Sequence, residues 1–359
     1  MTESIAQMDQ TRADAFSESM VDVLNHGALA LMLSVGHRTG LFETMAGRRP
    51  ATSQQIADAA GLHERYVREW LGAMTIGGVV LFDTETGTFS LPPEHAASLI
   101  DSGDNVALFT QWIAVMAGVE DDVVECFRNG GGVPYDRYPR FHAVMADDSG
   151  STVLGALREA ILPLVDGIVG RLEKGIDVLD VGCGSGRAII ELAKLFPESR
   201  FVGYDLSEAT IAEAQTRAEG TGLRNVRFET RDLSDFDVTA EPATYDLVVT
   251  FDAIHDQKRP GRVLAGIRRS LRPDGVYLMQ DIHASSHLEG NMDHPVGMLL
   301  YALSCMHCMT VSLAQGGDGV GAMWGRELAS EYLKEAGFGS FDIHQLEHDF
   351  QNDYYVIRP

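Results

Sequence analysis

The stretch Ile176-Asp-Val-Leu-Asp-Val-Gly-Cys-Gly-Ser-Gly186 determines how the rest of this chain can be organised. It begins with β-branched and apolar residues, as a buried strand does, and ends in three glycines at 182, 184 and 186. Glycine is needed where the backbone takes a positive φ or where a ligand lies directly against it. A helical pattern follows over residues 187–196, so the turn presents free backbone N–H groups. The stretch therefore predicts a nucleotide-binding turn between a strand and a helix.

The spacing of these glycines excludes the two commonest nucleotide fingerprints. A dinucleotide-binding G-x-G-x-x-G motif would need its third glycine at Arg187 or at Ile189. No Lys-Ser or Lys-Thr pair follows, so the turn is not a P-loop. The sequence D-V-G-C-G-S-G instead resembles motif I of the class I S-adenosylmethionine (AdoMet)-dependent methyltransferases.

Two further acids fit this resemblance. The next predicted strand, 200–205, ends in Asp205, 19 residues after Gly186, where a carboxylate can accept hydrogen bonds from both ribose hydroxyls. Asp232 directly follows the third strand, 226–230, and resembles the family position that binds the adenine amino group. The resemblance implies AdoMet as cofactor, with S-adenosylhomocysteine as its product. It also implies contacts from Asp180, Gly182, Cys183, Gly184, Gly186, Asp205, Leu206, Arg231, Asp232, Leu233, Phe251, Asp252, Ala253 and His255.

Strands and helices alternate from residue 176 onward, which predicts an α/β fold with a parallel sheet and right-handed crossovers. Strand 245–251 is followed by helix 260–271, a turn at Arg272-Pro-Asp-Gly275 and strand 276–282. In the family that the chain resembles, a terminal hairpin completes a Rossmann-like sheet of seven strands, six parallel and one antiparallel at the edge. We expect this catalytic domain to occupy residues 171–359.

The first hundred residues predict a separate winged-helix-like domain. Helical patterns at 52–62 and 63–76 precede two short apolar runs that flank the turn at 83–87. Residues 48–90 carry four basic side chains against five acids, whereas a DNA reader needs a basic face. We therefore favour dimerisation or packing over DNA binding, and in the small-molecule O-methyltransferases that the chain resembles such domains dimerise. A dense apolar run, Ala28–Val35, predicts burial on all sides, against a second subunit of a homodimer.

Residues 101–170 predict a helical connector interrupted by the irregular segment 130–139. In related methyltransferases the segment before motif I covers the cofactor and substrate. Tyr135, Tyr138 and Phe141 are therefore candidate substrate contacts, and the alternative is a domain linker with aromatic anchors.

Methyl transfer from a sulfonium requires alignment and exclusion of water, and an oxygen or nitrogen acceptor can also require a base. His255 and Asp281 follow or end strands four and five, at the rim where ligands bind in open α/β sheets. His255 is the first candidate for the base, with a capping or cofactor-contact role as the equal alternative; Asp281 and His307 are further catalytic candidates.

Residues 283–323 interrupt the alternation and contain five methionines and no Lys or Arg. We expect them to form a lid over an uncharged or weakly polar acceptor, because thioether side chains fit irregular apolar ligands. The predicted acceptor contacts in this region are His283, His294, Met298 and Met309. A structural zinc site at Cys305 and Cys308 would need further ligands, which several histidines could supply. We favour a pocket-lining role for this segment and expect no metal.

The charge of the chain limits its partners. With 28 basic and 52 acidic residues, the net charge of −24 disfavours nucleic acid and anionic membranes. The apolar run Val296–Ala314 contains Ser304, His307, Thr310 and Ser312, and it predicts a buried or pocket-lining helix. Four cysteines without a basic-then-apolar leader predict reduced thiols in the cytoplasm.

The sequence thus predicts an AdoMet-dependent methyltransferase that acts on a small, largely apolar metabolite with an oxygen or nitrogen acceptor. Two alternatives remain open: an AdoMet-binding enzyme on the same scaffold that does not methylate, and a ligand-responsive DNA regulator.

Overall fold

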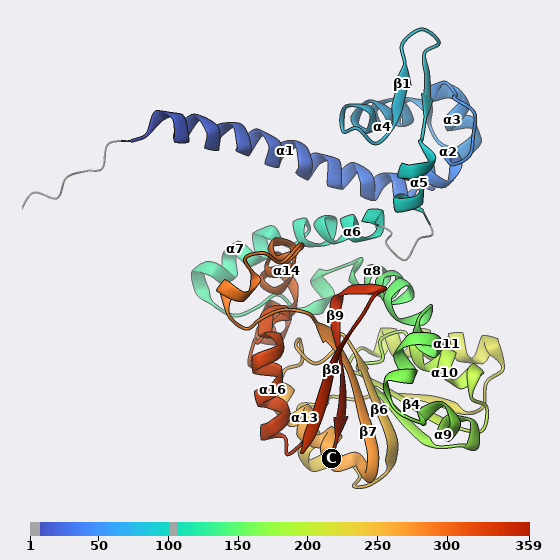
Figure 1. Cartoon of the computed structure of the whole chain (residues 1–359), viewed down its shortest axis with the longest axis vertical. Coiled ribbons are helices and arrows are strands. Elements are labelled where there is room, and N and C mark those ends of the chain that lie inside the picture. Colours follow the sequence, from blue (N-terminus) through green and yellow to red (C-terminus); the bar gives the residue numbers. More distant parts are fainter. Residues whose placement is uncertain (1–7, 101–105) are drawn as a thin grey trace, which may run out of the picture. The chain divides into compact units, whose positions relative to one another are not determined.

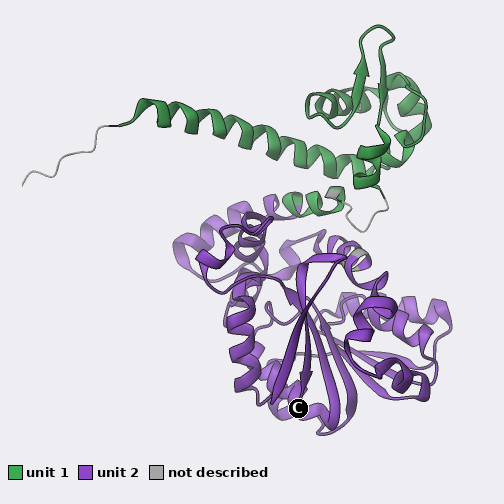
Figure 2. Cartoon of the chain, in the orientation of Figure 1, with its two compact units in different colours: residues 1–114 green, residues 115–359 purple. Residues whose placement is uncertain are grey.

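A computed structural model describes residues 8–100 and 106–359, and the chain divides into two units, residues 1–114 and 115–359 (Figure 2). Helix α6 (Val106–Ala117) runs across this division. Each unit is described by itself below. The three-part division expected from the sequence, 1–100, 101–170 and 171–359, remains a prediction.

The first unit contains the expected helix-turn-helix and hairpin. Its elements are α1 (Gln10–Arg38), α2 (Leu41–Met45), α3 (Ser53–Ala60), α4 (Glu64–Ile76), β1 (Leu81–Asp83), β2 (Thr88–Ser90) and α5 (Pro93–Leu99) (Figure 1). Helix α3 begins with a capping box between Thr52 and Gln55 and ends at Gly61 in the left-handed conformation. The Trp70 indole N–H donates to the Met32 carbonyl at 2.9 Å, which ties α4 to α1. These local signals give the winged-helix arrangement that the sequence predicts.

Burial of the dense apolar run on all sides is not what the single chain shows. Leu31 and Val35 are 42% and 41% exposed, because one stripe of α1 alone packs on the small domain. Gly36, near the C-terminal end of α1, belongs to that stripe, and an added Cβ there would come within 2.6 Å of the Trp70 ring. Towards its N-terminus α1 also exposes Phe16 (65%) and Leu24 (74%). The helix therefore presents apolar side chains that this chain does not cover.

The second unit is built on a seven-stranded sheet with the strand order β5-β4-β3-β6-β7-β9-β8. The strands are β3 (Asp177–Val181), β4 (Arg200–Asp205), β5 (Val226–Thr230), β6 (Tyr245–Phe251), β7 (Leu271–Ile282), β8 (Ser340–Leu346) and β9 (Asp349–Arg358) (Figure 1). Strands β3 to β7 are parallel, and β9 runs antiparallel to both β7 and β8. The expected topology is confirmed, with the antiparallel strand one place inside the edge.

One boundary in the sheet corrects the sequence analysis. Strand β7 begins at Leu271, five residues before the expected start, because Leu271 already pairs with Tyr245 of β6. The register then shifts, and the next pair is Leu247 with Val276. The predicted turn at 272–275 is thus an irregularity within a long strand, a feature that re-aims a strand without ending it.

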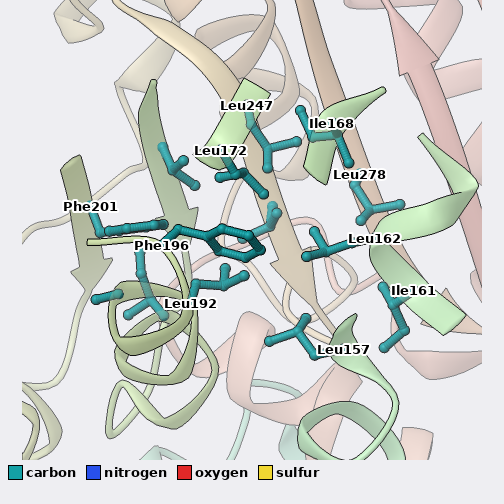
Figure 3. Close-up of a cluster of buried hydrophobic side chains, with 14 of the residues drawn as sticks. Leu157, Ile161, Leu162, Ile168, Leu172, Leu192, Phe196, Phe201, Leu247 and Leu278 are labelled. Carbon is teal, nitrogen blue, oxygen red and sulfur yellow. The ribbon is translucent and has the colours of Figure 1, made fainter. Parts of the chain in front are cut away.

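Helices cover both faces of the sheet. One core includes side chains from α9 (Ile168–Lys174), α10 (Arg187–Leu195) and α11 (Glu208–Thr221). Figure 3 shows Phe196 in this core among Leu172, Leu192, Phe201 and Leu247. The other core includes α12 (Phe236–Thr239), α13 (Pro260–Ser270) and α16 (Gly325–Glu335). The sheet is therefore buried on both sides, which leaves its carboxyl-end rim for ligands.

Two segments outside the alternation pack on each other. The first comprises α7 (Glu120–Asn129), η1 (Tyr135–Arg137), α8 (Phe141–Ser149), η2 (Gly150–Leu154), η3 (Leu157–Ile161) and η4 (Leu162–Leu164). The second comprises η5 (Leu288–Asn291), α14 (Gly297–Leu303), η6 (Ser304–Cys308), α15 (Met309–Ala314) and η7 (Ala322–Trp324). The Val133 N–H donates to the Thr310 hydroxyl at 2.9 Å, and the Tyr138 hydroxyl donates to the Met306 carbonyl at 2.5 Å. Elements η2, η3 and η6 are π-helical turns.

Within residues 8–100 and 106–359, two helices have the length and apolar composition of a membrane span, Gln10–Arg38 and Gly297–Ala314. The second is part of the folded unit, where the Ser312 hydroxyl donates to the Gln257 carbonyl at 2.9 Å.

Candidate active site

The second unit contains a cavity of about 590 Å³ at the carboxyl ends of β3, β4 and β6. The glycine loop, the residues after β4 and β5, and the residues after β6 form one part of its wall. Tyr135, Tyr138, Phe141, His142 and Met145 form another. The cavity thus joins the predicted cofactor loop to the predicted aromatic cover.

The glycine loop has the geometry that its sequence requires. Gly182, Gly184 and Gly186 have φ values of 78°, 52° and 73°, a region that side-chain-bearing residues rarely adopt. A Cβ at Gly182 would lie 2.6 Å from the Ala253 side chain, and one at Gly186 would lie 2.6 Å from the Phe228 ring. Gly182 and Gly184 line the cavity, as do Cys183 and Ala253. Gly186 is not among the lining residues, and its lack of a side chain permits close packing of α10 on β5.

Asp205 is held by the backbone on both carboxylate oxygens. Oδ2 accepts the Gly184 N–H at 2.8 Å, and Oδ1 accepts the Ser207 N–H at 2.8 Å. An ionised carboxylate accepts about four hydrogen bonds, so further donors can still bind. Asp232 is fixed in the same way, since its Oδ1 accepts the Ser234 N–H at 2.8 Å and this bond lowers the pKa of the carboxyl. Both acids line the cavity, together with the predicted contacts Leu206, Arg231, Leu233 and Phe251.

Asp180 differs from these two acids, because no described residue donates to its Oδ1. The side chain is 2% exposed, and burial, with a smaller contribution from the Asp205 charge, raises its pKa to about 8. The cavity wall as a whole carries six acids, at 136, 180, 205, 232, 252 and 256, against Arg187, Arg231 and Lys258. Such a wall favours a cationic ligand.

The aromatic part of the wall carries one polar contact into the cavity. The Tyr135 hydroxyl donates to Asp256 Oδ2 at 2.5 Å, and both residues line the cavity. Burial, the Asp256 charge and this hydrogen bond raise the Tyr135 pKa well above its usual value, so the phenol is neutral. Burial raises the Asp256 pKa to about 6.

His307 lies behind this wall. Its ring stacks on Phe141 with 3.8 Å between ring centroids, and the side chain is 2% exposed. Burial, followed by the positive charge of His255, lowers the His307 pKa to about 3, so the imidazole is neutral. Its Nε2 has no hydrogen-bond partner among the described residues. His307 itself is not among the cavity-lining residues.

His255 is also buried behind the wall, at 2% exposure, whereas the next residue, Asp256, lines the cavity. His255 Nδ1 lies 2.8 Å from Asp281 Oδ1 and 3.7 Å from Asp252 Oδ1. The Trp324 indole N–H donates to the same Asp281 oxygen at 2.9 Å. Burial lowers the His255 pKa, but Asp281 and Cys308 outweigh it and hold the pKa well above its usual value.

The structure does not bring the four predicted acceptor contacts of residues 283–323 to this cavity. His283 Nδ1 is 3.1 Å from Asp353 Oδ1, and His294 Nε2 is 3.0 Å from the His283 carbonyl oxygen. Met298 is 89% exposed, and Met309 packs against Gly321. From residues 283–323 the cavity wall includes Gln315. The apolar pattern predicted the helices of this segment, but it did not predict the direction in which their side chains point.

Many wall residues were not predicted. They include Met145, Ala146, Arg187, Ser207, Thr210, Gln257 and Lys258, as well as Asp256. Two had a local signal: Asp256 follows the rim histidine, and Arg187 is the first residue of the helix after the glycine loop.

Comparison with known proteins agrees with this geometry. Residues 172–350 match a family described as "Methyltransferase domain", and residues 27–100 match the Rv2258c-like winged HTH domain. The structure resembles the mitomycin 7-O-methyltransferase MmcR at 17% sequence identity, with 98% of this chain and 100% of that chain covered and a TM-score of 0.68. Human N-acetylserotonin methyltransferase in complex with SAM is similar at 15% identity, 99% coverage of both chains and a TM-score of 0.64.

Curated relatives match over the catalytic part. The malonyl-[acyl-carrier protein] O-methyltransferase of Bacillus cereus is 29% identical over 165 residues, which are 44% of this chain and 54% of that protein. The chain thus spans about half the length of this relative. Together with the glycine loop and its acids, the two family matches identify the protein: it belongs to the class I AdoMet-dependent methyltransferases with an N-terminal winged helix, and its cofactor is AdoMet.

Proposed function

We propose that the protein transfers the methyl group of AdoMet to an oxygen or nitrogen atom of a small, largely apolar metabolite. The observation that carries this proposal is the joint cavity, in which an acid-rich glycine loop and a group of aromatic side chains line one space. The acidic part of the wall suits the cationic cofactor, and the aromatic part suits a small, largely apolar acceptor.

The cofactor half fits AdoMet through three acids. Asp205 accepts two backbone N–H groups and the Thr210 hydroxyl at 3.3 Å, and its remaining lone pairs are proposed to accept the ribose hydroxyls. Asp232 lines the same cavity and is proposed to accept a hydrogen bond from the adenine amino group. The buried, unpartnered oxygen of Asp180 suits a positively charged group of the cofactor. When bound, AdoMet supplies an electrophilic methyl group on a sulfonium.

The acceptor half is proposed to consist of Tyr135, Tyr138 and Phe141, with Asp256 as its polar contact. Tyr135 orients the Asp256 carboxylate by a hydrogen bond. His307 lies behind Phe141 and His255 behind Asp256, so these two catalytic candidates and Asp281 act in this proposal as positioning residues. Their role is to fix the wall against which the acceptor is aligned.

The proposal is tested by incubating the full-length protein with isotopically methyl-labelled AdoMet and a library of small phenols, amines and hydroxylated polycycles. Mass analysis should show a labelled product that retains the acceptor skeleton. A labelled product from a phosphorylated or polyanionic acceptor in preference to neutral ones would contradict the proposed acceptor class. Turnover of AdoMet without any labelled acceptor would favour a non-methylating AdoMet enzyme.

We also propose that the protein is a cytoplasmic homodimer that binds neither nucleic acid nor membranes. The support is the row of exposed apolar side chains on α1, including Phe16 (65%), Val23 (58%) and Leu24 (74%). A row of this kind in water requires an apolar partner, and a second copy is always available. Light scattering of the full chain should report twice the chain mass, and a monomer at micromolar concentration would contradict the dimer.

The DNA-regulator alternative makes a different prediction. A gel-shift experiment at physiological salt should show no shift of duplex DNA, because the winged helix lacks a net positive charge.

A further inference from the structure

We propose that Arg187 binds the carboxylate of the methionine part of AdoMet, and that this contact fixes the cover segment, residues 141–154, over the cofactor. AdoMet carries two positively charged groups, the sulfonium and the ammonium, and one negatively charged group, the carboxylate. The acids of the cavity wall suit the first two, so the carboxylate needs a separate partner. The inference rests on AdoMet as cofactor and does not depend on the identity of the acceptor.

Arg187 occupies a position that the stability of its own helix does not explain. It is the first residue of α10, directly after Gly186 of the glycine loop, and it lines the cavity. The N-terminus of a helix carries a partial positive charge, which disfavours a cationic side chain in the first turn. None of the described side chains caps this N-terminus, and the first turn contains no acid. A negatively charged ligand would therefore be attracted both by the end of α10 and by Arg187.

The hydrogen bonds of Arg187 use one corner of its guanidinium. Nη1 donates to the Ala146 carbonyl at 2.6 Å and lies 3.6 Å from Asp147 Oδ1. The Asp147 side chain is 49% exposed, so this ion pair is weak. Nε has no hydrogen-bond partner among the described residues, and none of them meets Nη2 either. The edge formed by Nε and Nη2 matches the two oxygens of a carboxylate, so a carboxylate that approaches Nη2 would complete it.

Arg231 and Lys258, the other basic side chains of the cavity wall, are engaged elsewhere. Arg231 Nη2 donates to the Thr239 carbonyl at 3.1 Å. The pKa of Asp232 is lowered mainly by a backbone hydrogen bond and further by the charge of Lys258, so Lys258 lies near the acid proposed for the adenine amino group. In AdoMet the adenine and the carboxylate are at opposite ends of the molecule. Arg187 is therefore the wall cation that suits the carboxylate.

The same side chain reaches the cover segment. Ala146 belongs to α8, which continues into the π-helical turn η2, and both Met145 and Ala146 line the cavity. The hydrogen bond from Arg187 to Ala146 joins residues 41 positions apart, one at the start of α10 and one in the cover segment. A carboxylate that fixes the guanidinium therefore also fixes Ala146. We expect residues 141–154 to become more ordered when AdoMet binds.

The test compares AdoMet with decarboxylated AdoMet, which lacks the carboxylate alone, in calorimetric titrations of the full-length protein. The decisive variant is Arg187→Met, which keeps the length of the side chain and removes its charge and its donors. It should weaken AdoMet binding about tenfold to a hundredfold and leave the affinity for the decarboxylated analogue nearly unchanged. The ratio of the two affinities is the measured quantity, because effects that are common to both ligands cancel in it.

Lys258→Met is the matched control, because it removes a positive charge from the same cavity wall. Its ratio of the two affinities should equal that of the wild type. Arg187→Lys keeps the charge without the planar edge, and its ratio should lie between those of the wild type and Arg187→Met. Circular dichroism of the three variants confirms that they are folded.

Hydrogen exchange measures the link to the cover segment. At saturation of the wild type, AdoMet should slow amide exchange in residues 141–154 about fivefold more than decarboxylated AdoMet does. Arg187→Met should remove this difference between the two ligands.

The proposal is overturned if Arg187→Met lowers the affinity for both ligands by the same factor, or for neither. A ratio that changes in Lys258→Met and not in Arg187→Met would assign the carboxylate to Lys258 and would also overturn it. Equal protection of residues 141–154 by both ligands would refute the link to the cover segment. These experiments use no acceptor, so their outcome is independent of the labelled-product experiment that tests the proposed function.

Discussion

Asp281 and Asp353 face each other across strands β7 and β9, and both are fully buried, but their hydrogen-bond partners differ. Arg326 donates to both oxygens of Asp353, at 2.5 Å each, and His283 approaches the same carboxylate. Around Asp281, by contrast, His255, Trp324 and the Ile282 N–H all meet Oδ1, and Oδ2 is left without a donor. Asp353 thus has donors on both carboxylate oxygens, and we call such a residue a completed acid. Asp281 has donors on one oxygen alone, and we call such a residue an incomplete acid.

The same contrast occurs in the cofactor loop. Asp205 accepts backbone N–H groups on both oxygens, whereas the neighbouring Asp180 has an oxygen without a partner and an elevated pKa. A completed acid stabilises the fold or positions a loop. An incomplete buried acid lowers stability and is retained where a ligand supplies the missing partner. The following predictions test this distinction, in order of decreasing effect.

Removing the cation from the completed acid should have the largest effect. Arg326→Met leaves Asp353 buried with His283 as its remaining partner, and we expect a loss of about 3 kcal/mol in the free energy of unfolding. Trp324→Phe, which removes one donor from Asp281, should cost only about 1 kcal/mol. Urea unfolding followed by fluorescence and circular dichroism measures both. Equal losses would abolish the contrast between the two carboxylates.

Neutralising an incomplete acid should raise the free energy of unfolding, whereas the substitutions above lower it. The native Asp180 carboxyl keeps its proton up to a pKa of about 8, while the unfolded chain releases it near 3.8. The wild type therefore loses stability as pH rises from about 4 to 8, and the loss is complete above that range. Asp180→Asn should be more stable than the wild type without AdoMet at pH 9, and the difference should be much smaller at pH 5.

Denaturation of both proteins at pH 5, 7 and 9 gives this difference directly. A constant difference across the three pH values would show that Asp180 does not titrate as described. In AdoMet titrations the same variant should bind more weakly, so stability and ligand affinity should change in opposite directions.

Substituting the completed acid of the cofactor loop should affect binding more than folding. Asp205→Ala removes the carboxylate that is expected to accept the ribose hydroxyls, at a cost of about 1.5–3 kcal/mol in AdoMet affinity. Calorimetric titration measures this loss. Asp274→Ala, a change at an acid whose side chain is 81% exposed, serves as the control and should leave the affinity unchanged. Unchanged binding in the Asp205 variant would remove this residue from the site.

A neutral contact should have the smallest effect. Tyr138→Phe removes the hydrogen bond to the Met306 carbonyl and should lower stability by about 1 kcal/mol, with AdoMet affinity retained. Tyr66→Phe, at a side chain that is 79% exposed, is the matched control and should be neutral. A weaker AdoMet affinity in the Tyr138 variant would place this residue in the cofactor half of the cavity.

The cofactor half was predictable because its signals are local. Gly182, Gly184 and Asp205 lie within one strand–turn–helix–strand unit, and short-range backbone geometry fixes their positions. The acceptor half depends on contacts such as Tyr138 with Met306, 168 residues apart in the sequence. The local sequence around either residue does not indicate that the two are in contact.

The predicted contacts His283, His294 and Met298 show the same limit. Each was placed by its position after β7, but side-chain direction in this segment depends on how its helix turns against residues 130–139. Strand β7 starts before its predicted first residue for a related reason. Leu271 pairs with Tyr245 across the sheet although Pro273 and Gly275 locally favour a turn.

The π-helical turn Ser304–Cys308 has a consequence for how this enzyme could be altered. It lies between α14 and α15, and a π-turn contains one residue more than the α-helical turn it replaces. Deleting a single residue from it would let the segment continue as regular α-helix and would rotate one flank by about 100° relative to the other. His307 would then leave Phe141, or Thr310 would leave Val133, with the chain shortened by one amino acid. A deletion library across 304–308 would therefore vary the acceptor wall in large discrete steps that point substitutions do not reach.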